Sequence, residues 1–201
     1  MSAALQKIYL ASRSPRRREL LKQIGVPFEV LVLRDHPGRN VDVDESQQPG
    51  EGPDDYVRRV SRAKADAGWQ RIVQRRLRPF PVLAADTVVC VEEVILGKPP
   101  DAAHAAKMLR LLSGREHRVL TAVALKFDDR RELLVSESRV RFAELSDADI
   151  EAYVASGESA DKAGGYAIQG RAGAFITELR GSYSGVMGLP LYETAQLLKN
   201  F

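Results

Sequence analysis

The stretch PVLAADTVVCV, residues 81–91, is a near-continuous apolar run of the length of one β-strand. A strand that is apolar on both faces is typical of the centre of a sheet that helices cover on both sides. After the opening proline, Asp86 and Thr87 are the only residues that interrupt this run. The stretch therefore predicts a central, buried strand that is interrupted once by two polar residues, Asp86 and Thr87, which are called its polar step below.

Strands and helices alternate on the N-terminal side of this stretch. Their boundaries follow from apolar periodicity and from Ser, Pro and Gly at the positions where helices begin and end. The predicted elements are, in chain order, a strand at 7–12, a helix that Gly25 ends, a strand at 28–33, a polar loop at 34–52 and a helix at 53–76.

The C-terminal side introduces a hairpin. The predicted elements are a turn and short strand at 92–99, a helix from Asp101 to Gly114, two long strands at 117–127 and 131–145, a helix from Ser146 to Gly157, a glycine-rich loop at 158–174, a strand at 175–181 and a helix at 189–200. This order favours an α/β fold with a mixed sheet flanked by helices. No repeat or linker divides the chain, so we expect a single domain over residues 1–201, with two lobes around a central cleft.

The composition limits the classes of protein to consider. The 201 residues include 30 basic and 27 acidic side chains, a formal net charge of +3, and 6% aromatic residues. Nucleic-acid-binding proteins usually carry a stronger basic excess. A single cysteine, Cys90, excludes an intrachain disulfide, and no apolar stretch approaches the ~18 residues that a membrane span needs. We therefore expect a cytoplasmic protein that binds neither membranes nor nucleic acids.

The segment SRSPRRREL, residues 12–20, combines the end of a strand, a serine cap and paired arginines. The free N–H groups of a helix start attract anions, and Ser14 can cap this helix. Arg16 and Arg17 would oppose the helix dipole, but their guanidinium groups suit phosphate oxygens. The segment therefore predicts a phosphate-binding site, and a solvated basic helix start is the alternative.

Carboxylates in two segments are candidates for chemistry. A charge at Asp86 within a buried strand is costly unless it is paired or binds a metal, so Asp86 is a candidate metal ligand or proton acceptor. A structural ion pair is the alternative. Glu45, in VDVDES (41–46), could share a divalent cation with Asp86, since Mg²⁺ prefers one or two carboxylates together with phosphates and waters. A solvated acidic loop is the alternative for Glu45.

Three lysines and a glutamine complete the set of candidates. Lys64 lies within a predicted helix, Lys98 in the turn sequence GKP, and Lys162 in the glycine-rich loop. Lysines fixed around a cleft can neutralise phosphate charge in a transition state. Gln169, in the same loop as Lys162, offers a donor and an acceptor to the edge of a base. For each of these residues taken singly, the sequence does not distinguish a functional role from an ordinary surface position.

Together these segments resemble the Maf family of nucleotide pyrophosphatases, over nearly the whole chain. The segments that carry the resemblance are, in order, YLASRSPRRRELLKQIGVPFEV, VDES, YVRRVSRAKA, LAADTVV, LGKPPDAAHAAKMLRLLSGREHRVLTAVAL, YVASGESADKAGGYAIQG and GSYSGVMGLPLYET. The resemblance implies an elongated α/β fold similar to that of inosine triphosphatases, with the active site in a cleft between two lobes. It also implies a homodimer, which is common in the family.

The resemblance assigns roles to residues at matching positions. It places the phosphate-binding helix start at Ser14, Arg16 and Arg17, and polar active-site positions at Glu45, Lys64, Asp86 and Lys98. Asp86 matches the proton acceptor. The family branch that prefers 7-methyl-GTP carries Trp, Gln and Glu at the positions of Arg16, Thr87 and Gln169. Because this chain has none of these three, it resembles the branch that hydrolyses dTTP and UTP.

These assignments predict a metal-dependent hydrolysis. Mg²⁺ or Mn²⁺ would bridge Glu45, Asp86 and the triphosphate, and Asp86 would take a proton from the attacking water. The cationic side chains would stabilise charge on the phosphates, and Thr87 and Gln169 would select the base.

Two other classes of function stay open. One is a non-catalytic nucleotide-binding regulator of cell division or septum formation. The other is a nucleic-acid-binding protein that uses the basic stretches Arg16–Arg18 and Arg75–Arg78. Within the enzyme class, the substrate could also be a modified pyrimidine triphosphate.

Overall fold

The computed structural model describes residues 7–34 and 41–201, so the predicted polar loop at 34–52 lies partly outside the described residues. The strands are Ile8–Leu10 (β1), Phe28–Val30 (β2), Val82–Val91 (β3), Val94–Leu96 (β4), Glu116–Phe127 (β5), Arg130–Phe142 (β6) and Ile176–Arg180 (β7). The helices are Pro15–Gln23 (α1), Pro53–Gln74 (α2), Ala102–Leu112 (α3), Asp147–Ala155 (α4), Tyr183–Met187 (α5) and Leu191–Asn200 (α6), and 3₁₀ turns lie at Ala163–Gly165 (η1) and Arg171–Phe175 (η2).

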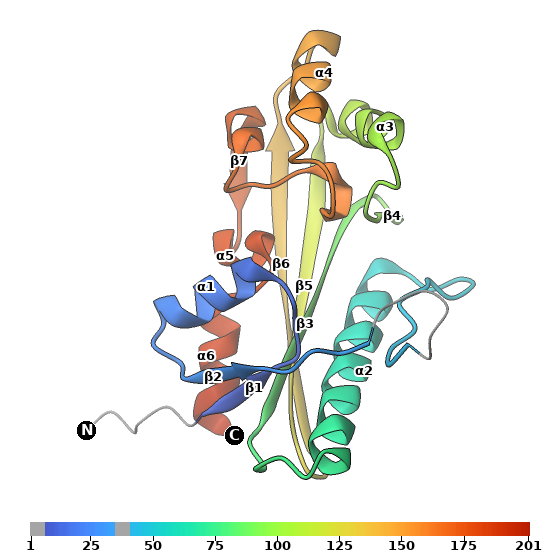
Figure 1. Ribbon diagram of the computed structural model, residues 1–201. Coiled ribbons are helices and arrows are strands. Elements are labelled where there is room, and N and C mark those ends of the chain that lie inside the picture. Colours follow the sequence, from blue (N-terminus) through green and yellow to red (C-terminus); the bar gives the residue numbers. More distant parts are fainter. Residues whose placement is uncertain (1–6, 35–40) are drawn as a thin grey trace.

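The strands form one mixed sheet in the order β2-β1-β3-β5-β6-β7, and β4 pairs with the far part of β3 (Figure 1). β1 lies parallel to β2 and β3, whereas β5, β6 and β7 continue the sheet in antiparallel pairing. Parallel neighbours require crossover connections, which α1 and α2 supply. The predicted α/β fold with an elongated mixed sheet is confirmed.

The β3 strand is buried on both faces, as its apolar sequence predicts. Side chains alternate between the two faces along a strand. Ala84 and Val88 pack in the clusters that α2 covers, whereas Leu83 and Ala85 pack in the cluster that includes α1 and α6. Every residue of β3 except Thr87 is buried. The strand therefore presents its polar step inside an otherwise apolar layer.

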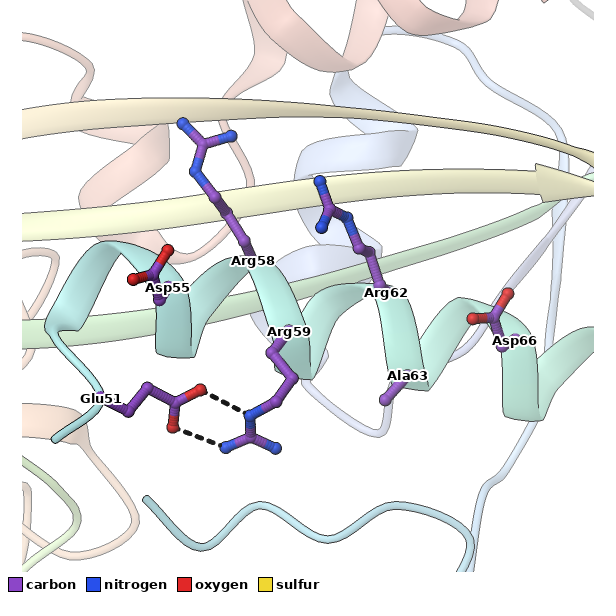
Figure 2. A pocket seen from close by; sticks show the side chains of 7 residues that line it. All are labelled: Glu51, Asp55, Arg58, Arg59, Arg62, Ala63 and Asp66. Atoms are coloured by element: carbon purple, nitrogen blue, oxygen red, sulfur yellow. Dashed lines mark hydrogen bonds and ion pairs between the residues drawn. The ribbon is translucent and has the colours of Figure 1, made fainter. Parts of the chain in front are cut away.

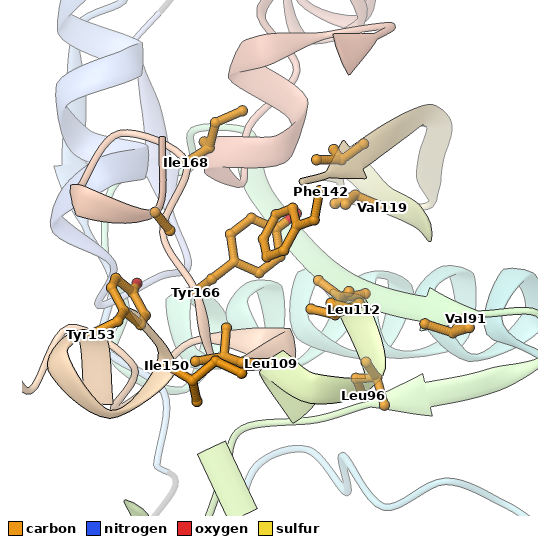
Figure 3. Close-up of a cluster of buried hydrophobic side chains, with 13 residues drawn as sticks. Val91, Leu96, Leu109, Leu112, Val119, Phe142, Ile150, Tyr153, Tyr166 and Ile168 are labelled. Carbon is orange, nitrogen blue, oxygen red and sulfur yellow. The ribbon is translucent and has the colours of Figure 1, made fainter. Parts of the chain in front are cut away.

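The hydrophobic core is divided between the two ends of the sheet. At one end, α3, α4 and the 3₁₀ turns enclose a cluster that contains Leu109, Phe142 and Tyr166 (Figure 3). At the other end, α1 and α6 cover one face and α2 covers the opposite face (Figure 1). On the face that holds Thr87, the two clusters stop at Ala85 and Val89. The polar step thus lies where one cluster ends and the next begins.

Some boundaries differ from the predictions for physical reasons. β6 ends at Phe142 instead of 145, because Ala143 donates to the carbonyl of Phe175 and accepts from the N–H of Gly114. The predicted loop at 158–174 contains η1 and all of η2 except Phe175, so β7 begins one residue later than predicted, at Ile176. The helix α5 is not evident from sequence, because five residues are too few to show a helical period.

Candidate active site

The polar step of β3 lies where one edge of this strand has no neighbouring strand among the described elements. On this edge, β1 pairs with β3 only as far as Leu83, and β4 pairs with it only from Val89 onward. The opposite edge is paired with β5. Residues 84–88 therefore border a gap between β1 and β4, and Asp86 and Thr87 lie within that gap.

A lysine bridges two carboxylates beside the gap. Nζ of Lys64 lies 2.8 Å from Oδ1 of Asp86 and 2.8 Å from Oε2 of Glu45. Asp86 is 7% exposed, so the ammonium group supplies the partner that a buried carboxylate requires. The close approach of α2 to β3 depends on Gly68, where an added Cβ would lie 2.7 Å from Cγ1 of Val82. The structural ion pair that the sequence left open is present, and it unites three of the predicted active-site residues.

The segment that carries Glu45 is fastened to α2 by two side chains that the sequence did not single out. The Tyr56 hydroxyl donates to the carbonyl of Glu45 at 2.8 Å, and Arg59 donates to the carbonyls of Asp44 and Ser46 at 3.1 and 2.8 Å. Burial raises the pKa of Tyr56 to about 12, so its hydroxyl stays protonated at neutral pH. Glu45 therefore belongs to an anchored segment, although its side chain is half exposed.

The start of α1 is built as predicted, and its arginines are held by the C-terminal end of α5 and the residue that follows it. Ser14 caps the helix by accepting from the N–H of Arg17. Nε of Arg17 donates to the carbonyl of Gly188 at 2.7 Å, and Nε of Arg16 donates to that of Met187 at 3.3 Å. Burial lowers the pKa of both arginines, while the charge of Asp86 acts to raise that of Arg17. Arg17 and Asp86 therefore belong to one electrostatic site.

Asp86 and Thr87 face opposite sides of the sheet, because successive strand residues alternate. Asp86 points toward α2 and contacts Lys64. The hydroxyl of Thr87 points toward α1 and accepts from Nη2 of Arg17 at 3.3 Å, and it lies 3.0 Å from the hydroxyl of Thr121. A ligand seated in the gap at the edge of β3 would therefore meet functional groups from both faces.

A backbone hydrogen bond between neighbouring glycines joins the segments that carry Lys98 and Lys162. The N–H of Gly164, two residues after Lys162, donates to the carbonyl of Gly97 at 3.1 Å. Gly164 has a φ of 70° and no room for a Cβ, which would lie 2.9 Å from Val89, so the glycine-rich loop packs directly on β3. Burial lowers the pKa of Lys162, and the positive charges of Arg16 and Lys98 lower it further. Cations from three separate segments thus act on one region.

Gln169 stands apart from this network. It is exposed at the end of the glycine-rich loop, and no hydrogen bond within the described chain joins it to another predicted site residue. The loop itself is anchored: the Tyr166 hydroxyl lies 2.8 Å from Nε2 of His117, and the N–H of Ala167 donates to the Tyr153 hydroxyl at 3.1 Å. The role of Gln169 in base selection remains a prediction.

The carboxylates suited to a metal are few. Among the described residues, no group of three or more His, Cys, Asp or Glu side chains is arranged to hold a metal ion. Glu45 and Asp86 both contact the ammonium of Lys64, so this position already attracts a positive charge. Two carboxylates match the small number that Mg²⁺ takes from a protein when a phosphate supplies further ligands.

A hollow of about 450 Å³ lies on the outer side of α2, and no predicted site residue lines it (Figure 2). Its charged lining combines both signs, because Arg58, Arg59 and Arg62 lie between Glu51 and Asp55 on one side and Asp66 on the other along the chain. Arg59 forms an ion pair with Glu51 across it (Figure 2). None of the described helices is long and apolar enough to cross a membrane.

Comparison with known proteins places the chain in a family. The model of the family described as "Maf-like protein" matches residues 7–201. The chain is 56% identical to the dTTP/UTP pyrophosphatase of Nitrosomonas europaea, over 96% of this chain and 93% of that protein. It is 57% identical to the dTTP/UTP pyrophosphatase of Aromatoleum aromaticum, over 97% and 95%. Among solved structures, the Ham1 protein of Staphylococcus aureus aligns with a TM-score of 0.48 and 17% identity, over 69% of this chain and 73% of that one. The chain belongs to the Maf family.

Proposed function

We propose that this protein hydrolyses dTTP and UTP between the α and β phosphates and releases the nucleoside monophosphate and pyrophosphate. The observation that carries the proposal is the bridge from Lys64 to Asp86 and Glu45, at a gap in the sheet that the cationic start of α1 also borders. Relatives at 56 and 57% identity carry the name dTTP/UTP pyrophosphatase, which supports the same substrates for this chain.

The triphosphate would lie among the cations of three segments. Besides burial, the charges of Arg16 at the start of α1 and of Lys98 after β4 both lower the pKa of Lys162 before η1, which indicates that these three cations lie near one another. Such a group of cations favours a polyanion and stabilises charge that develops on phosphate oxygens during the reaction. At the start of α1, Pro15 has no N–H, and the N–H groups of Arg17 and Arg18 donate to Ser14, so the N–H of Arg16 is the backbone donor left for an anion among the described hydrogen bonds.

A divalent cation, Mg²⁺ or Mn²⁺, fits the donor set of this site. Glu45 and Asp86 would hold it together with oxygens of the triphosphate. When bound, it would neutralise phosphate charge and acidify a bound water. Lys64 contacts one oxygen of each carboxylate, Oδ1 of Asp86 and Oε2 of Glu45, so each carboxylate keeps a second oxygen that could bind the cation.

Asp86 would act as the proton acceptor. Its carboxylate would take a proton from a water molecule, whose oxygen then forms a bond to phosphorus as the bond to the bridging oxygen breaks. The pyrophosphate leaves with the electrons of the broken bond. Lys64 holds Asp86 in one orientation through the 2.8 Å contact, and so acts as a positioning residue.

A panel assay tests this proposal. The protein is incubated with dTTP, UTP, CTP, GTP and pseudo-UTP, with Mg²⁺, with Mn²⁺ or with EDTA, and pyrophosphate release is measured together with nucleotide binding. We expect dTTP and UTP to be the best unmodified substrates and EDTA to abolish turnover. Tight binding without pyrophosphate release for any nucleotide would instead favour the non-catalytic regulator.

The homodimer and the cytoplasmic location remain predictions. Light scattering on the purified full chain would decide the first: a mass near twice the 22.2 kDa of one chain is expected, and a monomer across the accessible concentrations would contradict it.

A further inference from the structure

We infer that Thr121, a fully buried residue of β5, determines base selectivity by fixing the direction of the Thr87 hydroxyl, so that Thr87 can only accept a hydrogen bond from the nucleotide. The inference rests on the proposed function and specifies how the site would prefer uracil and thymine over cytosine. Thr121 would act through Thr87 and is therefore a positioning residue.

The direction of the Thr121 hydroxyl follows from its partner. Oγ1 of Thr121 lies 2.7 Å from the carbonyl oxygen of Gly185 in α5. A carbonyl oxygen only accepts hydrogen bonds, and a hydroxyl has a single proton to donate. The proton of Thr121 is therefore committed to Gly185.

The direction of the Thr87 hydroxyl follows in turn. The two threonine oxygens lie 3.0 Å apart, and since Thr121 has donated its proton elsewhere, Thr87 must be the donor between them. Nη2 of Arg17 donates to the same Thr87 oxygen at 3.3 Å. The Thr87 hydroxyl therefore already donates its proton to Thr121 and accepts from Arg17 with one lone pair. Its second lone pair is the one hydrogen-bonding position left for a ligand.

An oxygen that can only accept selects what lies against it. Phosphate oxygens are acceptors, so the group opposite Thr87 belongs to the nucleoside part of the substrate. Uracil and thymine carry a proton on N3, whereas N3 of cytosine carries a lone pair. Two acceptors facing each other in a partly buried site cost the penalty of an unmade hydrogen bond, which corresponds to roughly 10- to 100-fold in affinity. With N3 of the base facing it, Thr87 would therefore accept from uracil or thymine and disfavour cytosine in the same pose.

The surrounding contacts allow the Thr121 hydroxyl to be removed without unfolding the site. The Gly185 carbonyl also accepts from the N–H of Gly188 at 2.9 Å, so it keeps one partner when Thr121 loses its hydroxyl. Gly188 lies against the same pair of residues, since a Cβ added there would be 3.6 Å from Oγ1 of Thr87 and 3.6 Å from Nε of Arg17. Thr121→Val keeps the shape of the side chain and removes only its proton donor and acceptor.

The test compares Thr121→Val with Thr121→Ser, which keeps the hydroxyl. For each variant and for the parent, kcat/KM is measured with UTP, dTTP and CTP, and the dissociation constants of the α,β-methylene analogues of UTP and CTP are measured by calorimetry. In Thr121→Val the Thr87 hydroxyl is free to turn and donate to N3 of cytosine. The kcat/KM for CTP divided by that for UTP should therefore rise about tenfold or more. Thr121→Ser should keep the parent ratio.

Several outcomes would overturn the inference. An unchanged ratio in Thr121→Val, in both turnover and binding, would show that the polarity of Thr87 does not select the base. An equal loss for UTP and CTP would place the sugar, not the base, against Thr87. Thr87→Val provides a second reading, since loss of the acceptor should weaken UTP binding without improving CTP binding. If the parent binds the analogues but hydrolyses no triphosphate, the proposed function fails while the binding ratios still test Thr121.

Discussion

A carboxylate inside a buried strand needs a cation beside it, and Lys64 is that cation for Asp86. The sequence identifies Asp86 because a charge in an apolar run is unusual. It cannot identify Tyr56, Arg59 or Thr121 in the same way, because an aromatic or an arginine on a helix and a threonine in a strand look ordinary. Their importance arises from contacts across 11 to 64 positions in the chain, which no local pattern records.

Replacing Asp86 with Asn should retain nucleotide binding and lower kcat by roughly 10²- to 10⁴-fold, because an amide cannot accept the proton of a water. The measurement is steady-state pyrophosphate release with dTTP, beside calorimetric binding of the substrate analogue. Asp147→Asn is the matched control, since Asp147 is an exposed aspartate that also pairs with a basic side chain, Arg110. Turnover of Asp86→Asn at the parent rate would refute the assigned role.

Replacing Lys64 with Met should leave Asp86 and Glu45 without a shared cation. The free energy of unfolding should fall by about 1–3 kcal/mol in EDTA, because one of the two carboxylates is buried. Added Mg²⁺ should stabilise this variant more than the parent, as measured by melting temperature, since the ion can take the place of the ammonium. The double variant with Glu45→Gln should lose that extra stabilisation; an identical Mg²⁺ response in all three proteins would argue against a shared cation position.

His117 should contribute to the pH dependence of the free energy of unfolding. Burial lowers its pKa from 6.5 to about 4 in the folded chain. Between these values the unfolded chain binds a proton that the folded chain does not. The stability that His117 contributes is therefore fully present above pH 6.5 and is lost as the pH falls toward 4. It amounts to about 3 kcal/mol at most. Chemical unfolding at pH 7, 5.5 and 4.5 should show a smaller loss for His117→Gln than for the parent, and equal losses would contradict this account.

At the scale of elements, the sequence predicts the helix starts well and the connections poorly. Ser14, Asp101 and Ser146 are caps that can be identified locally, and all three accept the expected backbone hydrogen bond. The end of α5 shows no such local signal, yet the carbonyl groups of Met187 and Gly188 hold Arg16 and Arg17. Backbone acceptors are present at every residue, so their use depends on the fold alone.

The segment that bears Glu45 should depend on one arginine of α2. Arg59 donates to two of its carbonyls and pairs with Glu51, so Arg59→Gln should release the segment. Hydrogen exchange over residues 41–51 should quicken, and kcat/KM should fall by about tenfold, consistent with the loss of 1–2 kcal/mol of positioning contacts. The exposed neighbour Arg62, replaced by Gln, serves as the control. If exchange in this segment matches that of the Arg62 variant, Arg59 does not anchor it.

At the scale of the whole molecule, the alternation of strands and helices followed by a hairpin is sufficient to predict a mixed sheet. The strand order and the gap between β1 and β4 are not accessible from sequence, because they depend on how far each short strand pairs along β3. Because of that gap, Lys64 of α2 and the arginines of α1 both lie beside the same edge of β3. The single domain over residues 1–201 remains a prediction at this scale.

The central claim is that the carboxylate pair held by Lys64 directs water to the bond between the α and β phosphates. The most direct measurement is phosphorus NMR of UTP incubated with Mg²⁺ and either the parent protein or the Asp86→Asn variant. The account predicts UMP and pyrophosphate as the only products of the parent, and intact UTP with the variant over the same time. Formation of UDP and inorganic phosphate, or equal product from both proteins, would contradict it.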